Sequence, residues 1–161
     1  MHRVGQFIGH LTARIGPDEE ARARRLLPAT AWPLFDAMPT ADRRHALNVA
    51  RRLEAAGHAD ADLLAAAMLH DAAKGPRMRL WHRVAGVLLD AVSPRMLVRL
   101  ASADEASWRY PYHLYLHHAG LSADAALRAG CSPRTASFIR GSSLLGDAPL
   151  AAALLRADEA G

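Results

Sequence analysis

The sequence predicts an all-α fold, and three observations point to it. Alanine and leucine, which form helices readily, dominate the composition, whereas isoleucine, valine and the aromatic residues are sparse. Apolar residues recur at helical spacing, and no strand-like alternation of useful length occurs. Proline and glycine fall between the apolar segments, where helices begin and end. With 161 residues and no internal repeat or low-complexity linker, we expect one domain of about eight or nine helices.

Start and stop signals place most of the expected helices. Pro17 opens an acidic first turn, and Pro28 and Pro33 interrupt the stretch that follows. Thr40 is the expected N-cap of a helix that ends before Gly57. Seven further helices are expected, over residues 60–74, 79–91, 94–100, 112–118, 122–129, 132–140 and 148–160. A loop at residues 101–111 is expected between the third and the fourth of them.

Three segments have distinct apolar patterns. Residues 63–69 are apolar all round, which predicts a helix buried on every side. Residues 79–91 are amphipathic, and one side of that helix carries the large apolar residues Trp81, Val84, Val87 and Leu88. The N-terminus lacks a signal-peptide profile and has the spacing of a short amphipathic helix or a partly ordered arm. We expect residues 1–39 to form a helical segment that packs on a main domain of residues 40–161.

The net charge and the cysteine content limit which ligands and which cellular compartment are expected. The formal net charge of +4 suits phosphate-bearing ligands, but the arginine pairs are short and interrupted by acids, so nucleic-acid binding has little support. Cys131 is the only cysteine, which excludes an internal disulfide and a cysteine-based zinc site and suits a reducing cytoplasm. No apolar run approaches the ~20 residues that span a membrane. We therefore expect a cytoplasmic protein without a membrane partner.

Four polar residues lie where apolar faces are expected. His45 shares a helix face with core positions, His70 and Asp71 end the segment that is apolar all round, and Asp158 lies on the apolar stripe of the last helix. One buried histidine alone is more often a core residue, and one buried acid is often paired with an arginine. Four such residues on three helices need a shared partner, and a divalent cation satisfies all of them. Imidazole and carboxylate ligands suit one Mn, Fe, Co, Ni, Mg or Zn ion.

The same four residues carry a family resemblance. His45, the pair His70-Asp71 twenty-five residues later, and Asp158 in the final helix are similar in order to the H…HD…D signature of HD-domain phosphohydrolases. The surrounding segments RRHALNVARRL, DLLAAAMLHDAAKG and LAAALLRADEAG also resemble those of the family, over about three quarters of the chain. The resemblance implies an HD-type helical bundle in which these four residues bind the metal. It also implies hydrolysis of a phosphate ester or anhydride, commonly of a nucleotide, by a metal-activated water.

Further residues are expected around the metal. The resemblance and the spacing place Lys74 one turn after Asp71, where it either neutralises a phosphate or pairs with an acid. We expect Asp71, Lys74 and His118 to act in catalysis, with Asp71 orienting the water and His118 near the substrate or acting as a proton donor. His117 is open to either role, since only one of the two neighbouring histidines faces inward on a regular helix.

The number of metals and the phosphate ligands are less well defined. Two-metal members of the family often carry another histidine near the position where this chain has Ser142 and Ser143, and serine is a poor ligand, so we expect one metal. Lys74, His117, His118 and Arg140 are the expected substrate-binding residues, although several arginines are equally suited to hold phosphate: Arg43, Arg44, Arg77 and Arg140.

Alternatives remain at the level of function. An aromatic cluster stacks on a base or sugar or, more commonly, belongs to the core: Trp108, Tyr110, Tyr112 and Tyr115. A metal-dependent phosphohydrolase acting on a small phosphate-containing substrate, most readily a nucleotide, is the favoured hypothesis. The alternative is a non-catalytic HD-fold module that binds a nucleotide or a protein, and a homo-oligomer is left open.

Overall fold

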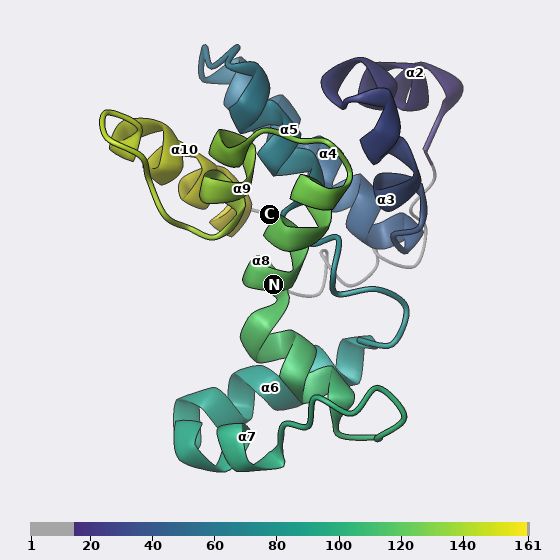
Figure 1. Ribbon diagram of the computed structural model, residues 1–161, viewed down its shortest axis with the longest axis vertical. Helices are drawn as coiled ribbons and strands as arrows, with labels where there is room; N and C mark the ends of the chain where they lie inside the picture. The colour runs from purple at the N-terminus through teal and green to yellow at the C-terminus, as the bar shows by residue number, and fades with distance from the viewer. Residues whose placement is uncertain (1–14, 161) are drawn as a thin grey trace.

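The computed structural model describes residues 15–160, and these residues form nine α-helices and a short 3-10 turn without any β-strand. This confirms the predicted all-α fold. The helices are α2 (Pro17–Leu26), α3 (Trp32–Asp36), α4 (Thr40–Ala55), α5 (Ala61–Leu69), α6 (Leu80–Val92), α7 (Pro94–Leu100), α8 (Tyr110–Arg128), α9 (Pro133–Ile139) and α10 (Ala148–Glu159), and the 3-10 turn η1 is Ala29–Ala31. Figure 1 shows their arrangement.

Helix α5 lies at the centre of the bundle. Every residue from Leu63 to Leu69 is buried, which confirms the prediction for the segment that is apolar all round. Helices α4, α9 and α10 pack around α5, and α2 and α3 contact it from another side (Figure 1). Burial of α5 therefore places its C-terminal end, where His70 and Asp71 follow, inside the bundle. The expected domain boundary after residue 39 stays a prediction, and the expected amphipathic segment at the N-terminus lies largely outside the described residues.

Helix boundaries follow local chemistry, with one correction at a cap. Asp60 accepts a hydrogen bond from the Leu63 amide at 3.0 Å and so caps α5. Gly57 ends the turn after α4 with a φ of +87°, a conformation that favours glycine. The expected N-cap Thr40 is instead the first residue of α4, because Pro39, with a φ of −52°, takes the capping position.

Two expected helices have different limits. Helix α5 ends at Leu69 rather than near residue 74, and residues 70–77 form turns. The predicted helices 112–118 and 122–129 are one continuous helix, α8. Both differences meet at Ser122, which is fully buried and accepts a hydrogen bond from the Ala73 amide at 3.0 Å. This bond fixes the turn segment against α8, so Ser122 does not cap a new helix.

Helices α6 and α7 form a lobe with the first half of α8, at the end of the molecule away from α5 and α10 (Figure 1). The predicted apolar stripe of α6 exists, but it faces solvent: Trp81 is 54% exposed and Leu88 is 60% exposed. Periodicity shows that apolar residues share a face but does not show what covers it. None of the helices between residues 15 and 160 combines the length and the apolar character needed to cross a bilayer.

Candidate metal centre

Side chains from three parts of the bundle meet beside the end of α5. His45 comes from α4, His70 follows α5 directly, and Asp158 comes from α10. His45 Nε2 lies 2.7 Å from Asp158 Oδ1, and His70 Nε2 lies 3.3 Å from the same oxygen. One donor atom from each of these residues lies within 4.8 Å of the others. Their convergence from positions up to 113 residues apart matches the spacing that a single cation requires.

Asp71 adds a buried carboxylate to this group. Its side chain is almost fully buried, and its Oδ1 atom lies 3.7 Å from His70 Nε2. Neither atom forms a well-aligned hydrogen bond among the described residues, although Asp158 Oδ1 lies 3.3 Å from His70 Nε2 and Lys74 Nζ lies 2.7 Å from Asp71 Oδ1. Such atoms are uncommon in folded proteins because burial without a partner is costly. A cation bound between them would satisfy both, so the residues present fit a divalent metal.

The histidine ring orientations also suit a metal. His70 Nδ1 donates a hydrogen bond to the Ala67 carbonyl oxygen at 3.0 Å, and His118 Nδ1 donates to the Tyr115 carbonyl oxygen at 2.9 Å. A carbonyl oxygen can only accept, so Nδ1 carries the proton in both rings. When the ring is neutral, this leaves the lone pair on Nε2, the nitrogen that faces the carboxylates.

The electrostatics keep both carboxylates negative. Burial opposes ionisation of Asp158, but the adjacent rings of His45 and His70 outweigh it and lower the pKa of Asp158. Burial likewise opposes ionisation of Asp71, and the charges of His70 and Lys74 lower its pKa. Burial disfavours the charged form of His70, yet Asp158 and Asp71 raise its pKa overall. The negative charge that stabilises the His70 imidazolium is the charge that a divalent cation would balance.

Lys74 and His118 also lie beside Asp71. Lys74 Nζ donates a hydrogen bond to Asp71 Oδ2 at 2.7 Å, so of the two expected roles the structure shows pairing with an acid. His118 Nε2 lies 3.9 Å from Asp71 Oδ1. Burial and the charge of Lys74 lower the pKa of His118, which keeps its ring neutral near pH 7. His117 is exposed, and its ring centre lies 4.5 Å from that of His113.

A cavity of about 190 Å³ opens beside the metal ligands. His70, His118, Asp158 and Arg140 contribute its polar lining. Its remaining wall is mainly apolar and comes from α8, α9 and α10: Ala119, Phe138, Ile139, Gly141, Ala151, Leu154 and Leu155. The arrangement places imidazole, carboxylate and guanidinium groups at one apolar hollow, which suits an anion with an apolar neighbour.

The other predicted residues lie as follows. Arg140 forms an exposed ion pair with Asp124. Arg43 and Arg44 pair with Asp36 and Glu19 on neighbouring helices, so Arg140 is the arginine of the predicted group that reaches the cavity. After α9, the Ser142 hydroxyl donates to the Ser137 carbonyl oxygen at 3.1 Å. In the aromatic cluster Tyr112 is buried, whereas Trp108 is 68% exposed. Burial raises the pKa of the Cys131 thiol, as expected of a structural cysteine.

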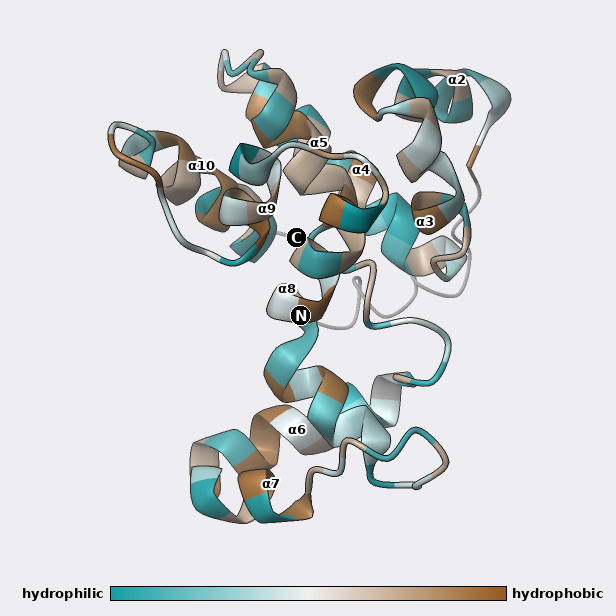
Figure 2. Cartoon of the chain, in the orientation of Figure 1, coloured by the Kyte–Doolittle hydropathy of each residue, from teal (hydrophilic) through white to brown (hydrophobic). Residues whose placement is uncertain are grey.

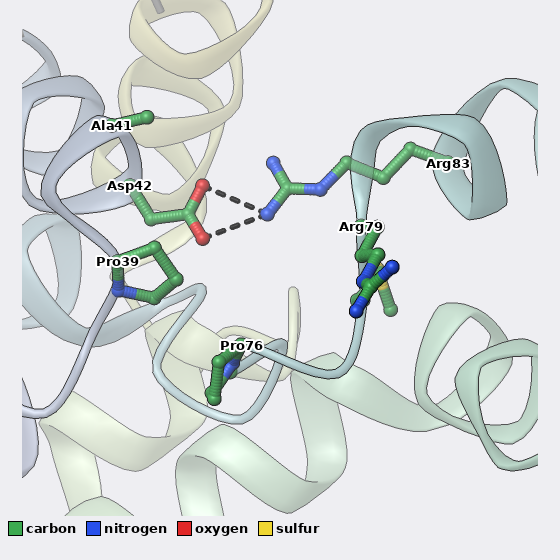
Figure 3. A pocket seen from close by; sticks show the side chains of 8 residues that line it. Pro39, Ala41, Asp42, Pro76, Arg79 and Arg83 are labelled. Atoms are coloured by element: carbon green, nitrogen blue, oxygen red, sulfur yellow. Dashed lines mark hydrogen bonds and ion pairs between the residues drawn. The ribbon is translucent and has the colours of Figure 1, made fainter. Parts of the chain in front are cut away.

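The sequence reasoning missed Asp42. This residue is buried on α4, one turn before His45, and Arg83 of α6 approaches its two carboxylate oxygens at 2.8 and 2.7 Å. Figure 3 shows the pair at a cavity of about 300 Å³ that also borders Pro39, Pro76 and Arg79. An acid in the first turn of a helix is usually explained by its interaction with the helix dipole. The position of Asp42 in the sequence therefore gave no reason to expect that its side chain is buried.

Comparison of the chain with family models, with curated proteins and with solved structures finds no match. The geometry of the site is therefore the basis for a functional proposal.

Proposed function

We propose that the chain is a metal-dependent phosphohydrolase of the HD class that cleaves a phosphate ester or anhydride, most readily of a nucleotide. The observation that carries the proposal is the convergence of two buried atoms, His70 Nε2 and Asp71 Oδ1, which lie 3.7 Å apart beside His45 and Asp158. Support also comes from the order of these residues, which resembles the H…HD…D signature. A decayed module would not need to keep the buried carboxylate of Asp71 at the same point as the half-buried carboxylate of Asp158.

Four residues would hold the cation: His45, His70, Asp71 and Asp158. When bound, a divalent ion lowers the pKa of a water molecule and neutralises charge on a phosphoryl group. Arg140 would bind a phosphoryl oxygen through its guanidinium group, since it lines the same cavity as His70 and Asp158. Lys74 holds Asp71 in place through their hydrogen bond. His118 Nε2, on a neutral ring, can take up or release a proton beside Asp71.

The size of the cavity indicates which part of a substrate enters it. A volume of about 190 Å³ is smaller than the ~300–1,000 Å³ that encloses a drug-sized ligand. The cavity therefore suits the phosphoryl end of a nucleotide and the group next to it, while the rest of the molecule lies outside.

Metal content measured by elemental analysis tests the proposal. Protein without a histidine tag would be incubated with Mn, Co, Ni or Mg, dialysed and analysed as wild type, as Asp71→Asn and as the control Asp18→Asn, which changes an exposed acid on α2. We expect about one metal per chain in the wild type and the control, and a strong loss in Asp71→Asn. Circular dichroism would confirm that each variant is folded.

The next measurement is hydrolysis by the metal-loaded protein. A panel of nucleotides and p-nitrophenyl phosphate esters would be used, and we expect phosphate release that Asp71→Asn abolishes and Asp18→Asn retains. Two metals per chain would make His118 a ligand as well. Metal binding without any hydrolysis would favour the non-catalytic module, and absence of metal after incubation with all four ions would refute the proposed centre.

A further inference from the structure

Helix α6 has a solvent-facing side without a single charge. At 100° per residue, the apolar residues of this side fall within an arc of about 140° on the helix surface. Their exposed fractions run from 52% for Val84 to 83% for Val92. The side comprises Trp81, Val84, Val87, Leu88, Ala91 and Val92 and is called the α6 face below. Figure 2 shows the brown bands of α6 and α7 at the outer end of the lobe.

Among residues 15–160, no element packs on the α6 face. The opposite side of α6 already contacts α8, where His82 is buried and Gly86 meets the ring of Tyr115. A helix that lies on a protein surface in water normally carries polar residues on its outer side. A continuous exposed apolar surface of this kind marks an interaction site in a soluble protein. The α6 face therefore needs an occupant.

Arginines lie at both ends of the α6 face. Arg79 precedes the first turn of α6 and is exposed, and Arg95 and Arg99 are exposed on α7, which follows the last turn. Asp90 is the only acid on α6. At the N-terminal end, Arg79 shares a cavity of about 490 Å³ with Arg77, Glu105, Trp81 and Trp108, and Arg77 donates a hydrogen bond to the Glu105 carbonyl oxygen there. Both indole rings are more than half exposed there.

The arginines at the two ends of the α6 face favour a negatively charged surface over a second copy of the chain as its occupant. If a second copy of the chain covered the α6 face, an antiparallel pairing would bring Arg79 of one copy toward Arg95 and Arg99 of the other. A parallel pairing would bring identical arginines together, so either pairing places like charges side by side. A surface that carries negative charge throughout meets both ends of the face favourably. Tryptophan and arginine around an apolar stripe are typical of helices that lie in the headgroup region of a bilayer.

We propose that the α6 face docks onto an anionic phospholipid surface. The apolar side chains enter the boundary between headgroups and acyl chains, and the arginines at its ends contact lipid phosphate. The cavity between Trp81 and Trp108 accepts a headgroup through Arg77 and Arg79. The expectation of no membrane partner came from the lack of a spanning segment, whereas the α6 face concerns attachment to a surface. This inference does not depend on the proposed hydrolase activity.

Vesicle flotation of the full chain tests the inference. Vesicles of phosphatidylcholine alone would be compared with vesicles that also contain phosphatidylglycerol, at low and high salt. We expect binding to the anionic vesicles and its loss at high salt, because the arginine contacts are screened. Tryptophan fluorescence should shift to the blue on binding, and Trp81→Phe together with Trp108→Phe should remove most of that shift. Binding to neither vesicle type would overturn the proposal.

Matched substitutions separate the α6 face from the rest of the surface. Leu88→Ser should lower vesicle partitioning about tenfold, because it removes apolar volume from the boundary region. Leu145→Ser, at a fully exposed leucine outside the lobe, should leave it unchanged. The double variant Arg79→Gln, Arg95→Gln should bind the anionic vesicles more weakly, by roughly fivefold for each arginine lost. The control double variant Arg25→Gln, Arg128→Gln changes exposed arginines outside the lobe and should bind as the wild type does.

The oligomeric state in solution tests whether a second copy of the chain, instead of lipid, covers the α6 face. The mass of the wild type in solution would be measured by light scattering without lipid, and we expect a monomer. A dimer that Leu88→Ser dissociates would show that a second copy covers the α6 face and would overturn the lipid proposal. Equal vesicle binding by wild type and Leu88→Ser, with both folded by circular dichroism, would also refute it.

Discussion

Two helical glycines give opposite predictions for the same substitution. Gly86 of α6 faces α8, and a Cβ atom added there would lie 2.6 Å from Tyr115 Cδ2. Gly120 of α8 has no such neighbour, because nothing lies within 4 Å of its added Cβ. Neither glycine has a positive φ, so the backbone accepts alanine at both positions. The pair thus isolates the effect of packing between α6 and α8.

The magnitudes follow from two competing effects. Alanine stabilises a helix interior by about 1 kcal/mol relative to glycine. At Gly120 this gain is expected in full. At Gly86 the Tyr115 ring must move by about 1 Å, and overpacking of this kind costs about 1–3 kcal/mol. Gly120→Ala should therefore raise the free energy of unfolding by up to ~1 kcal/mol, whereas Gly86→Ala should leave it unchanged or lower it by up to ~2 kcal/mol.

Urea denaturation followed by circular dichroism provides the assay. The free energies of unfolding of the two variants would be compared at equal m-values, so that the difference reports stability alone. We expect Gly120→Ala to be the more stable by about 1–3 kcal/mol. If both substitutions raised stability equally, the Tyr115 ring would have moved without cost. The close approach of α6 to α8 would then be no constraint on the position of the lobe.

Two further predictions concern buried polar groups. Asp42→Ala should lower the free energy of unfolding by about 2 kcal/mol, because it leaves Arg83 without its buried partner. The control Asp36→Ala, at an exposed ion pair with Arg43, should change that free energy by less than ~0.5 kcal/mol. Urea titration measures both changes. Burial lowers the pKa of His82 in the folded protein, so the unfolded chain binds more protons as the pH falls through about 6.5, and stability should fall over that interval. Thermal unfolding between pH 7.5 and 5 should show a smaller fall for His82→Gln than for the wild type, and an equal fall in both would contradict a buried neutral ring.

Sequence patterns predicted the helices best where composition and end signals agreed. The segment 63–69 was buried as predicted, since residues apolar all round leave no side for water. The continuous α8 was missed because Gly120 and Ser122 resemble a stop and a cap. A single glycine costs a helix only about 1 kcal/mol, and packing of α8 against its neighbours outweighs that cost.

The candidate site was predictable from the sequence in its residues but not in its contacts. Polar residues at core positions indicated His45, His70 and Asp158, and the structure brings them within 4.8 Å. The spacing placed Lys74 near Asp71 but left open whether it would neutralise a phosphate or pair with an acid, and the tertiary structure shows the bond to Asp71. Asp42 was missed because its partner Arg83 lies 41 residues away, and pairings at that distance depend on the tertiary fold.

The turn segment at residues 70–77 belongs to both parts of the molecule. It begins with His70 and Asp71 at the candidate metal centre and leads within three residues to the first turn of α6. The Ala73 amide bound to Ser122 is an anchor in its middle, and the Asp42–Arg83 pair is a second tie between the bundle and the lobe. A displacement of the lobe would therefore act on the bundle through the Ala73–Ser122 hydrogen bond and the Asp42–Arg83 pair. These two contacts lie close in sequence to Asp71 and His45, two of the residues that the candidate metal centre needs in place.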